Sequence, residues 1–231
     1  MKKIVLLLLV VFLSFAYAET VPVLINEKEY KGEKIGEYIF VTKNNLLLYK
    51  DKVYDLIKIE DYYISKDVGI LFDGKDIFKI ILHKDLILCP DKNILFKDEK
   101  KYETKNLGKI YFAITGYNYN LSEFKLFAYG IYPKWRYILL ELCIFNLNTS
   151  PIVLQQNMFK LRVGNKDYYP DSASSIYLSS EGKEVLFKRP LNPNEGISIY
   201  LIYDVPGLPD KLKIDLSLGL QKPFEITLPQ F

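Results

Sequence analysis

The amino-acid sequence predicts an all-β protein, with a C-terminal β-sandwich preceded by a small antiparallel β-meander domain. Short apolar and aromatic runs between charged turns fill the first half of the chain, and longer runs of alternating apolar and polar residues fill the second. Alternation with a period of two is typical of strands that bury one face. Helical patterning is scarce, and we expect at most a turn or two of helix, within residues 172–182.

The N-terminus has the three parts of a secretory signal peptide. Lys2 and Lys3 supply positive charge, residues 4–15 form an apolar run, and residues 16–18 are Ala-Tyr-Ala, an A-x-A cleavage site. The apolar run is shorter than the roughly 20 residues of a membrane-spanning helix. We therefore expect cleavage after residue 18 and a periplasmic or secreted protein, with an uncleaved N-terminal anchor as the alternative. No cysteine near the cleavage site is available for lipid attachment.

Length and charge limit the number of domains and the kinds of partner that we expect for the rest of the chain. Removal of residues 1–18 leaves 231 − 18 = 213 residues, enough for one large or two small domains. Without Lys2 and Lys3, 31 − 2 = 29 basic residues face 28 acidic ones, a formal charge of +1. A nearly neutral chain without a basic block has no electrostatic footprint for nucleic acid. We therefore expect no nucleic-acid partner, and a membrane contact only through the signal peptide before its cleavage.

Cys89 and Cys143 are the only cysteines. An oxidising compartment permits a disulfide between them. Two buried free thiols are the alternative, because cysteine also behaves as a small core residue. Neither cysteine has the C-x-x-C spacing of redox or zinc sites.

Residues 19–108 predict a domain of successive hairpins. Tyr49, Phe72 and Phe96 are 23 and 24 positions apart and precede similar charged turns. The Asp73-Gly74 pair is a strong hairpin signal, because a type I′ turn needs a positive φ at both central residues. Either this is a structural repeat or the likeness arises by chance from a chain rich in Lys, Asp, Leu and Tyr. In both cases the segment predicts an antiparallel meander.

Residues 109–231 predict the sandwich. Two segments alternate strictly, which predicts one buried and one solvent-facing side for each. The predicted inward residues are Ile197, Ile199, Leu201, Tyr203 and Val205 in the first segment, and Leu212, Ile214, Leu216, Leu218 and Leu220 in the second.

Two stretches of this half, LLELCIFNLNTSPIVLQQNMFKLRVGNKDYYPDSAS and LNPNEGISIYLIYDVP, carry a resemblance. They resemble the immunoglobulin-like (telokin-like) domain of unknown function found in bacterial secreted proteins and lipoproteins. The matching positions are Asn146, Ile152, Phe159, Leu161, Gly164, Tyr168, Pro170, Asp171, Pro193, Glu195, Tyr203, Asp204, Val205 and Pro206. Asn194 stands where the family usually has Gly, and Asn tolerates a left-handed turn. The resemblance implies a seven- or eight-stranded sandwich without a known reaction or ligand.

The segment from Phe159 to Ser174 predicts a strand, a Gly164-Asn165 turn and a chain that leaves the sheet at Pro170, which lacks an N–H group. Asp167 and Asp171 suggest a calcium site as an alternative. The closely spaced acidic residues of a calcium loop are absent, so we expect a turn and no metal.

Sequence motifs for catalysis are missing. His83 is the only histidine, which excludes multi-histidine metal sites, and no G-x-S-x-G motif or phosphate-binding glycine loop is present. His83 lies in an ordinary strand pattern, so we expect a structural role. Two carboxylates close in space are sufficient for glycoside hydrolysis, and a sequence does not exclude such a pair.

Aromatic residues are dense between positions 111 and 137. We expect exposure of Tyr117, Tyr119, Tyr132 and Trp135, the residues of apparent loop tips, and propose them as partner-binding residues. The alternative is that these rings fill the sandwich core.

The predicted function is that of an exported, non-catalytic binding or structural module of the bacterial cell envelope. We expect it to contact an envelope protein or a cell-wall polymer, without a cofactor. The alternative is an extracytoplasmic glycan hydrolase with paired carboxylates.

Overall fold

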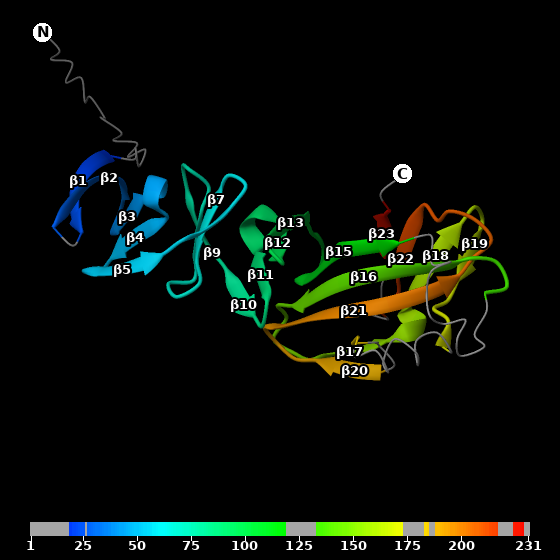
Figure 1. The fold of residues 1–231 in the computed structure, drawn as a ribbon. Coiled ribbons are helices and arrows are strands. Elements are labelled where there is room, and N and C mark those ends of the chain that lie inside the picture. The colour runs from blue at the N-terminus through cyan, green and yellow to red at the C-terminus, as the bar shows by residue number, and fades with distance from the viewer. Residues whose placement is uncertain are drawn as a thin grey trace, which may run out of the picture. The chain divides into compact units, whose positions relative to one another are not determined.

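A computed structural model describes residues 19–25, 27–118, 133–172, 183–184, 188–216 and 224–228 (Figure 1). The described elements are strands and short 3-10 turns, which confirms the all-β prediction. Within these ranges no helix is long and apolar enough to cross a membrane. The predicted signal peptide, residues 1–18, and most of the predicted helical segment lie outside the described residues.

The chain forms two compact units, of which the first ends at Ile77 and the second begins at Phe78. The predicted domain boundary between residues 108 and 109 therefore falls inside the second unit. Each unit is described below by itself.

The first unit contains two antiparallel meanders. One has the strand order β1(Glu19–Ile25), β2(Lys28–Ile35), β3(Tyr38–Val41), β4(Leu46–Tyr49) and β5(Lys52–Asp55). The other has the order β6(Ile57–Ile59), β7(Tyr62–Ser65), β8(Ile70–Phe72) and β9(Ile77–Lys79), where β9 continues into the second unit. Phe40 and Phe72 stack with their ring centroids 4.2 Å apart, and they pack with Leu47 and Leu56 in one apolar core.

The backbone repeats every 24 residues. Positive φ angles recur at Gly36 (59°), Glu60 (52°) and Lys84 (53°), the first turns of three copies, and again at Gly108 (54°), which follows the third copy. A second series, Asn45 (54°), Gly69 (77°) and Asn93 (53°), has the same spacing. The N–H groups of Leu56 and Thr104 donate to the carbonyls of Asn45 and Asn93, so the first and third copies close in the same way. The likeness seen in the sequence therefore reflects a structural repeat.

The third copy lies in the second unit. It is a four-stranded antiparallel meander with the order β10(Ile81–His83), β11(Leu86–Cys89), β12(Ile94–Lys97) and β13(Lys100–Glu103). The 3-10 turn η2(Pro90–Lys92) joins β11 to β12.

The rest of the second unit is a sandwich around one apolar core. One sheet has the order β14(Lys105–Leu107), β15(Ile110–Asn118), β16(Tyr137–Asn146) and β21(Glu195–Asp204). The other has the order β19(Lys166–Tyr168), β18(Phe159–Val163), β22(Lys211–Ile214) and β23(Phe224–Thr227). A two-stranded sheet pairs β17(Ile152–Gln155) with β20(Lys188–Leu191). All three sheets contribute buried side chains to the core.

The predicted inward residues of β21 and β22 are buried in this core, from Ile197 to Val205 and from Leu212 to Leu216. Leu218 and Leu220 lie outside the described residues. The prediction of a solvent-facing side is wrong for the sheet that contains β21. Leu86, Leu88 and Leu95 of the third copy pack against the outer residues of that sheet, and this contact joins the third copy to the sandwich.

Residues of the family-like pattern serve the fold. Asn146 is fully buried, and its side-chain amide donates to the carbonyls of Ser150 (3.0 Å) and Leu191 (2.9 Å). Asn194 has a φ of 60°, the left-handed turn expected for it. Tyr203 is fully buried, and its hydroxyl lies 3.4 Å from the Phe159 carbonyl to which it donates.

Cys89 and Cys143 are free, buried thiols, so the structure agrees with the second of the two alternatives. Cys143 Sγ lies 3.6 Å from Thr115 Oγ1. Burial raises the pKa of both thiols and keeps them protonated.

Candidate functional site

Trp135 lies at one end of the sandwich, on the loop that leads into β16. Its side chain is 48% exposed, and its ring meets the Tyr168 ring edge-on with the centroids 5.9 Å apart. The Lys134 ammonium lies 4.6 Å from the centroid of the Trp135 ring. One side of the indole is therefore supported by protein, and about half of its surface faces solvent.

The loop that carries Trp135 is fixed by one carboxylate. Asp204, the last residue of β21, accepts hydrogen bonds from the backbone N–H groups of Lys134 (2.6 Å), Trp135 (2.9 Å) and Arg136 (3.1 Å). The Val205 N–H group donates to the Arg136 carbonyl at 2.9 Å. These contacts restrain the backbone from which the indole projects, which reduces the entropy lost when such a side chain binds a partner.

The other predicted partner-binding residues have different positions. Tyr119 and Tyr132 lie outside the described residues. Tyr117 lies on β15 and packs, partly buried, against the sandwich core, in contrast to the exposure expected for it. The cause is a β-bulge between Ile114 and Gly116, which shifts the register so that Tyr117 pairs with Leu140 on the core side.

Residues 159–168 form a hairpin, and Ala173 and Ser174 of the predicted segment lie outside the described residues. β18 turns at Gly164, with a φ of 57°, into β19, and Tyr168 is the ring that packs against the core. Asp167 binds cations of the protein itself: Arg162 Nε at 2.5 Å and Lys213 Nζ at 3.3 Å. Among the described residues, no three His, Cys, Asp or Glu side chains are grouped as metal ligands.

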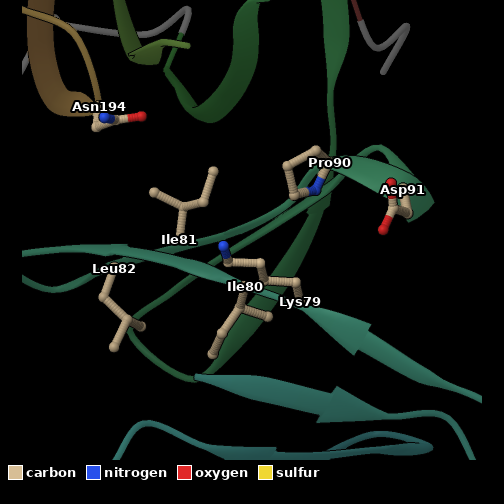
Figure 2. A pocket seen from close by; sticks show the side chains of 7 residues that line it. All are labelled: Lys79, Ile80, Ile81, Leu82, Pro90, Asp91 and Asn194. Atoms are coloured by element: carbon tan, nitrogen blue, oxygen red, sulfur yellow. The ribbon is translucent and has the colours of Figure 1, made fainter. Parts of the chain in front are cut away.

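A cavity of about 520 Å³ opens beside β10 (Figure 2). Its lining comes from the end of β9, from β10 and the residue that precedes it, from η2 and from the turn before β21. The lining residues are Lys79, Ile80, Ile81, Leu82, Pro90, Asp91 and Asn194. Figure 2 shows Asn194 across the opening from Lys79, and Asp91 next to Pro90 on another part of the rim.

The cavity has an apolar floor and an unusual set of polar groups. Ile80 is buried, whereas Leu82 is 40% exposed on this surface. The Lys79 ammonium and the Asp91 carboxylate form no ion pair with the described residues, and the Asn194 side chain forms no hydrogen bond with them. Three polar groups of different character are therefore available at one apolar cavity.

A second, smaller cavity of about 250 Å³ lies on the other sheet. It is lined by Gln155, Asn157, Met158, Lys160, Tyr169 and Asp215. The Tyr169 ring is 56% exposed, and the Lys160 ammonium lies 5.1 Å from its centroid.

A polar cluster lies between the third copy and the outer side of the sandwich sheet. Lys97 of β12 forms an ion pair with Glu141 of β16. Ser198 of β21 donates to Glu141 Oε1 at 2.9 Å and accepts from Lys97 Nζ at 3.3 Å.

The protonation of this cluster argues against Lys97 as a base for Ser198. Burial lowers the pKa of the Lys97 ammonium, but the hydrogen bond to Glu141 and its charge raise it by more, so the pKa is raised overall. Lys97 therefore retains its proton and cannot act as the base that activates Ser198. Burial raises the pKa of the Glu141 carboxyl, but Lys97 and Ser198 together lower it by more. The cluster is a charged contact that joins two sheets.

His83 lies on β10, as its strand pattern predicts. Its Nε2 atom is buried and has no hydrogen-bond partner among the described residues. The neighbouring carboxylate Glu195 is already engaged, because it accepts from the Asn192 N–H group at 2.8 Å and from Arg189 Nη2 at 2.7 Å.

The carboxylates that a glycan hydrolase requires are not paired at either cavity. Asp91 is the single carboxylate of the larger cavity, and Asp215 is that of the smaller one. Glu184 and Glu195 both form ion pairs with Arg189.

The comparisons with known proteins give distant likenesses. No protein-family model matches this chain, and no curated protein matches it. A solved structure of the yjhA protein from Bacillus subtilis is similar, with a TM-score of 0.40 and 16% identity over 55% of this chain and 96% of that chain. A second solved structure, described as "a putative lipoprotein (ycdA)" from Bacillus subtilis, has a TM-score of 0.38 and 14% identity, over 54% of this chain and 38% of that chain. Similarity of this degree supports no conclusion about function, so the functional proposal depends on the residues of this chain.

The sequence reasoning missed the cavity at β10. Pro90, Asp91 and Asn194 have the composition of ordinary turns. Asn194 is more than a hundred positions away from Ile81, and no local signal relates the two residues. Only the contact of the third copy with the sandwich brings them together.

Proposed function

We propose that this protein is an exported, non-catalytic binding module of the bacterial cell envelope, which contacts a protein or cell-wall partner through the surface around Trp135. One observation carries the proposal: a half-exposed tryptophan projects from a loop whose backbone is fixed by Asp204. Tryptophan is over-represented among the residues that dominate binding interfaces. A restrained loop adds affinity because little order is lost on binding.

Export is part of the proposal and is supported by the N-terminal sequence. A charged start, an apolar run and an A-x-A site follow one another in residues 1–18. Membership of the sandwich in the immunoglobulin-like (telokin-like) domain family is likewise proposed. Its support is the set of matching positions, among which Asn146, Asp204 and Tyr203 have defined structural contacts.

The non-catalytic assignment rests on the state of the polar groups. Lys97 keeps its proton beside Ser198 and forms an ion pair with Glu141, so these groups are engaged in a contact between two sheets. Glu184 and Glu195 are each ion-paired with Arg189, so neither is a free acid or base.

The test is cross-linking of the tagged protein in its native envelope, followed by mass spectrometry, together with sedimentation of the purified protein with isolated cell wall. We expect one reproducible partner, or cell-wall binding, for the wild type and its loss in Trp135→Ala. Val153→Ala is the matched control, because Val153 is 46% exposed but lies on β17. Equal capture by wild type and Trp135→Ala would contradict the proposal, as would loss of capture in the Val153→Ala control.

A further inference from the structure

We propose that the cavity beside β10 binds a short apolar peptide with both of its termini free. The cavity is separate from the surface around Trp135, and the inference does not depend on the function proposed for that surface. Its basis is the combination of an apolar floor, one cation, one anion and one amide around a single opening.

The apolar part of the ligand follows from the floor. Ile81 and the Pro90 ring from η2 supply partly exposed apolar surface. Figure 2 shows Ile81 on the same side of the strand as Lys79, with Ile80 and Leu82 on the other side. Contact of Ile81 and Pro90 with an aliphatic side chain would remove their surface from water, which is favourable in proportion to the apolar area buried.

The charges of the ligand follow from the rim. Lys79 and Asp91 have opposite charges and no ion-pair partner among the described residues. A carboxylate is complementary to the Lys79 ammonium, and an ammonium is complementary to Asp91, whereas the Asn194 amide across the opening is complementary to a peptide group of the ligand. A fatty carboxylate would satisfy Lys79 but leave Asp91 against an uncharged chain. A zwitterion with an apolar body satisfies both groups.

The size of the ligand follows from the volume. The cavity measures about 520 Å³, within the range of about 300–1,000 Å³ typical of small-molecule sites. An extended residue spans about 3.3–3.6 Å, so a chain of about two or three residues separates its two termini enough to reach different parts of the rim. Figure 2 shows Lys79 and Asp91 on different parts of the rim.

The test is isothermal titration of the predicted mature chain, residues 19–231, with Leu-Leu, with N-acetyl-Leu-Leu and with Leu-Leu amide. We expect Leu-Leu to bind most tightly. Acetylation should weaken binding about fivefold in the wild type and have no effect in Asp91→Asn, because both changes remove the same contact between exposed charges. Amidation should likewise weaken binding in the wild type and have no effect in Lys79→Met, because both changes remove the contact with the ligand carboxylate. Ile81→Ala should weaken all three probes.

Matched controls separate the site from general charge effects. Lys105→Met and Asp85→Asn change exposed charges of the second unit that do not line the cavity, and both should bind like the wild type. Trp135→Ala should also bind Leu-Leu normally, so failure of this inference is distinguishable from failure of the proposed function. No binding of Leu-Leu at millimolar concentration would overturn the inference. The inference would also be wrong if octanoate bound as tightly as Leu-Leu and if Asp91→Asn did not change the affinity for either compound.

Discussion

At the scale of single residues, the contact between Lys97 and Glu141 joins the third copy to the sandwich. Lys97 is 9% exposed, and it reaches Glu141 and Ser198 across the boundary between two sheets. A buried pair of this kind is costly to break on one side, because the remaining charge loses both water and its partner. The pair can form only when the two sheets of the second unit pack in one particular position relative to each other.

We expect Lys97→Met to lower the free energy of unfolding by about 1–3 kcal/mol, the cost of leaving a buried polar group unsatisfied. The double variant Lys97→Met with Glu141→Leu should recover part of that loss, because neither charge is then left alone. Urea unfolding of the single and double variants measures both effects. Additive losses in the double variant would show that the two residues do not act as a pair.

The same pair predicts an acid-sensitive part of the stability. The pKa of Glu141 is lowered from its ordinary value of 4.5, because the bonds from Lys97 and Ser198 outweigh the effect of burial. Its contribution is complete above that value and is lost as the pH falls through the lower pKa of the folded state. Glu141→Gln should therefore show a shallower loss of stability in acid, by less than about 1.4 kcal/mol per pH unit. Urea unfolding over a pH series provides the measurement, and identical acid slopes for the two proteins would refute this prediction.

At the scale of elements, a β-bulge in β15 changes which of its side chains face the core. Ile114 pairs with Leu142 and Tyr117 pairs with Leu140, so two residues of opposite parity face the same core. Between them, Gly116 pairs with Glu141, and a Cβ atom on it would lie 2.9 Å from Glu141 Oε2. The bulge thus moves Tyr117 inward and leaves space for the carboxylate that binds Lys97.

The pairing of β16 with β21 contains another close approach. Phe145 lies over Gly196, where an added Cβ atom would be 2.6 Å from the Phe145 ring. We expect Gly196→Ala to destabilise the protein by about 1–3 kcal/mol, the usual cost of overpacking a filled core. Gly207→Ala is the control, because its added Cβ atom would be 3.4 Å from Val163. Thermal unfolding should show a lower Tm for Gly196→Ala alone, and equal Tm values would contradict the close packing.

At the scale of the whole molecule, the predicted and observed divisions of the chain differ for a physical reason. The third copy buries Leu86, Leu88 and Leu95 against the sandwich residues Ala113, Cys143 and Phe145. Sequence similarity groups this copy with the first two copies, whereas packing groups it with the sandwich.

We expect residues 78–231 to fold as a unit and residues 109–231 to be less stable, because the shorter fragment exposes the covered side of the sheet and leaves Glu141 without Lys97. Thermal unfolding compares the two fragments. Cys143 provides a second measurement, since its buried thiol should resist a thiol reagent in the longer fragment and react in the shorter one. Equal stability and equal reactivity would indicate that the third copy contributes nothing to the sandwich.

The sequence by itself determined the all-β class and the inward residues of β21, because these depend on local alternation. The prediction of a type I′ turn at Asp73-Gly74 is wrong, because Gly74 has a positive φ (88°) and Asp73 does not; the Asp73 carboxylate instead accepts from the N–H groups of Lys75 and Asp76. The sequence also predicted the left-handed turn at Asn194, where a polar side chain tolerates a positive φ. Only the tertiary structure decided which side of the sandwich sheet is covered, that Tyr117 faces inward, and that Asn194 meets Ile81 at a cavity. These features depend on one bulge and on contacts between distant segments, and neither has a periodic signal along the chain.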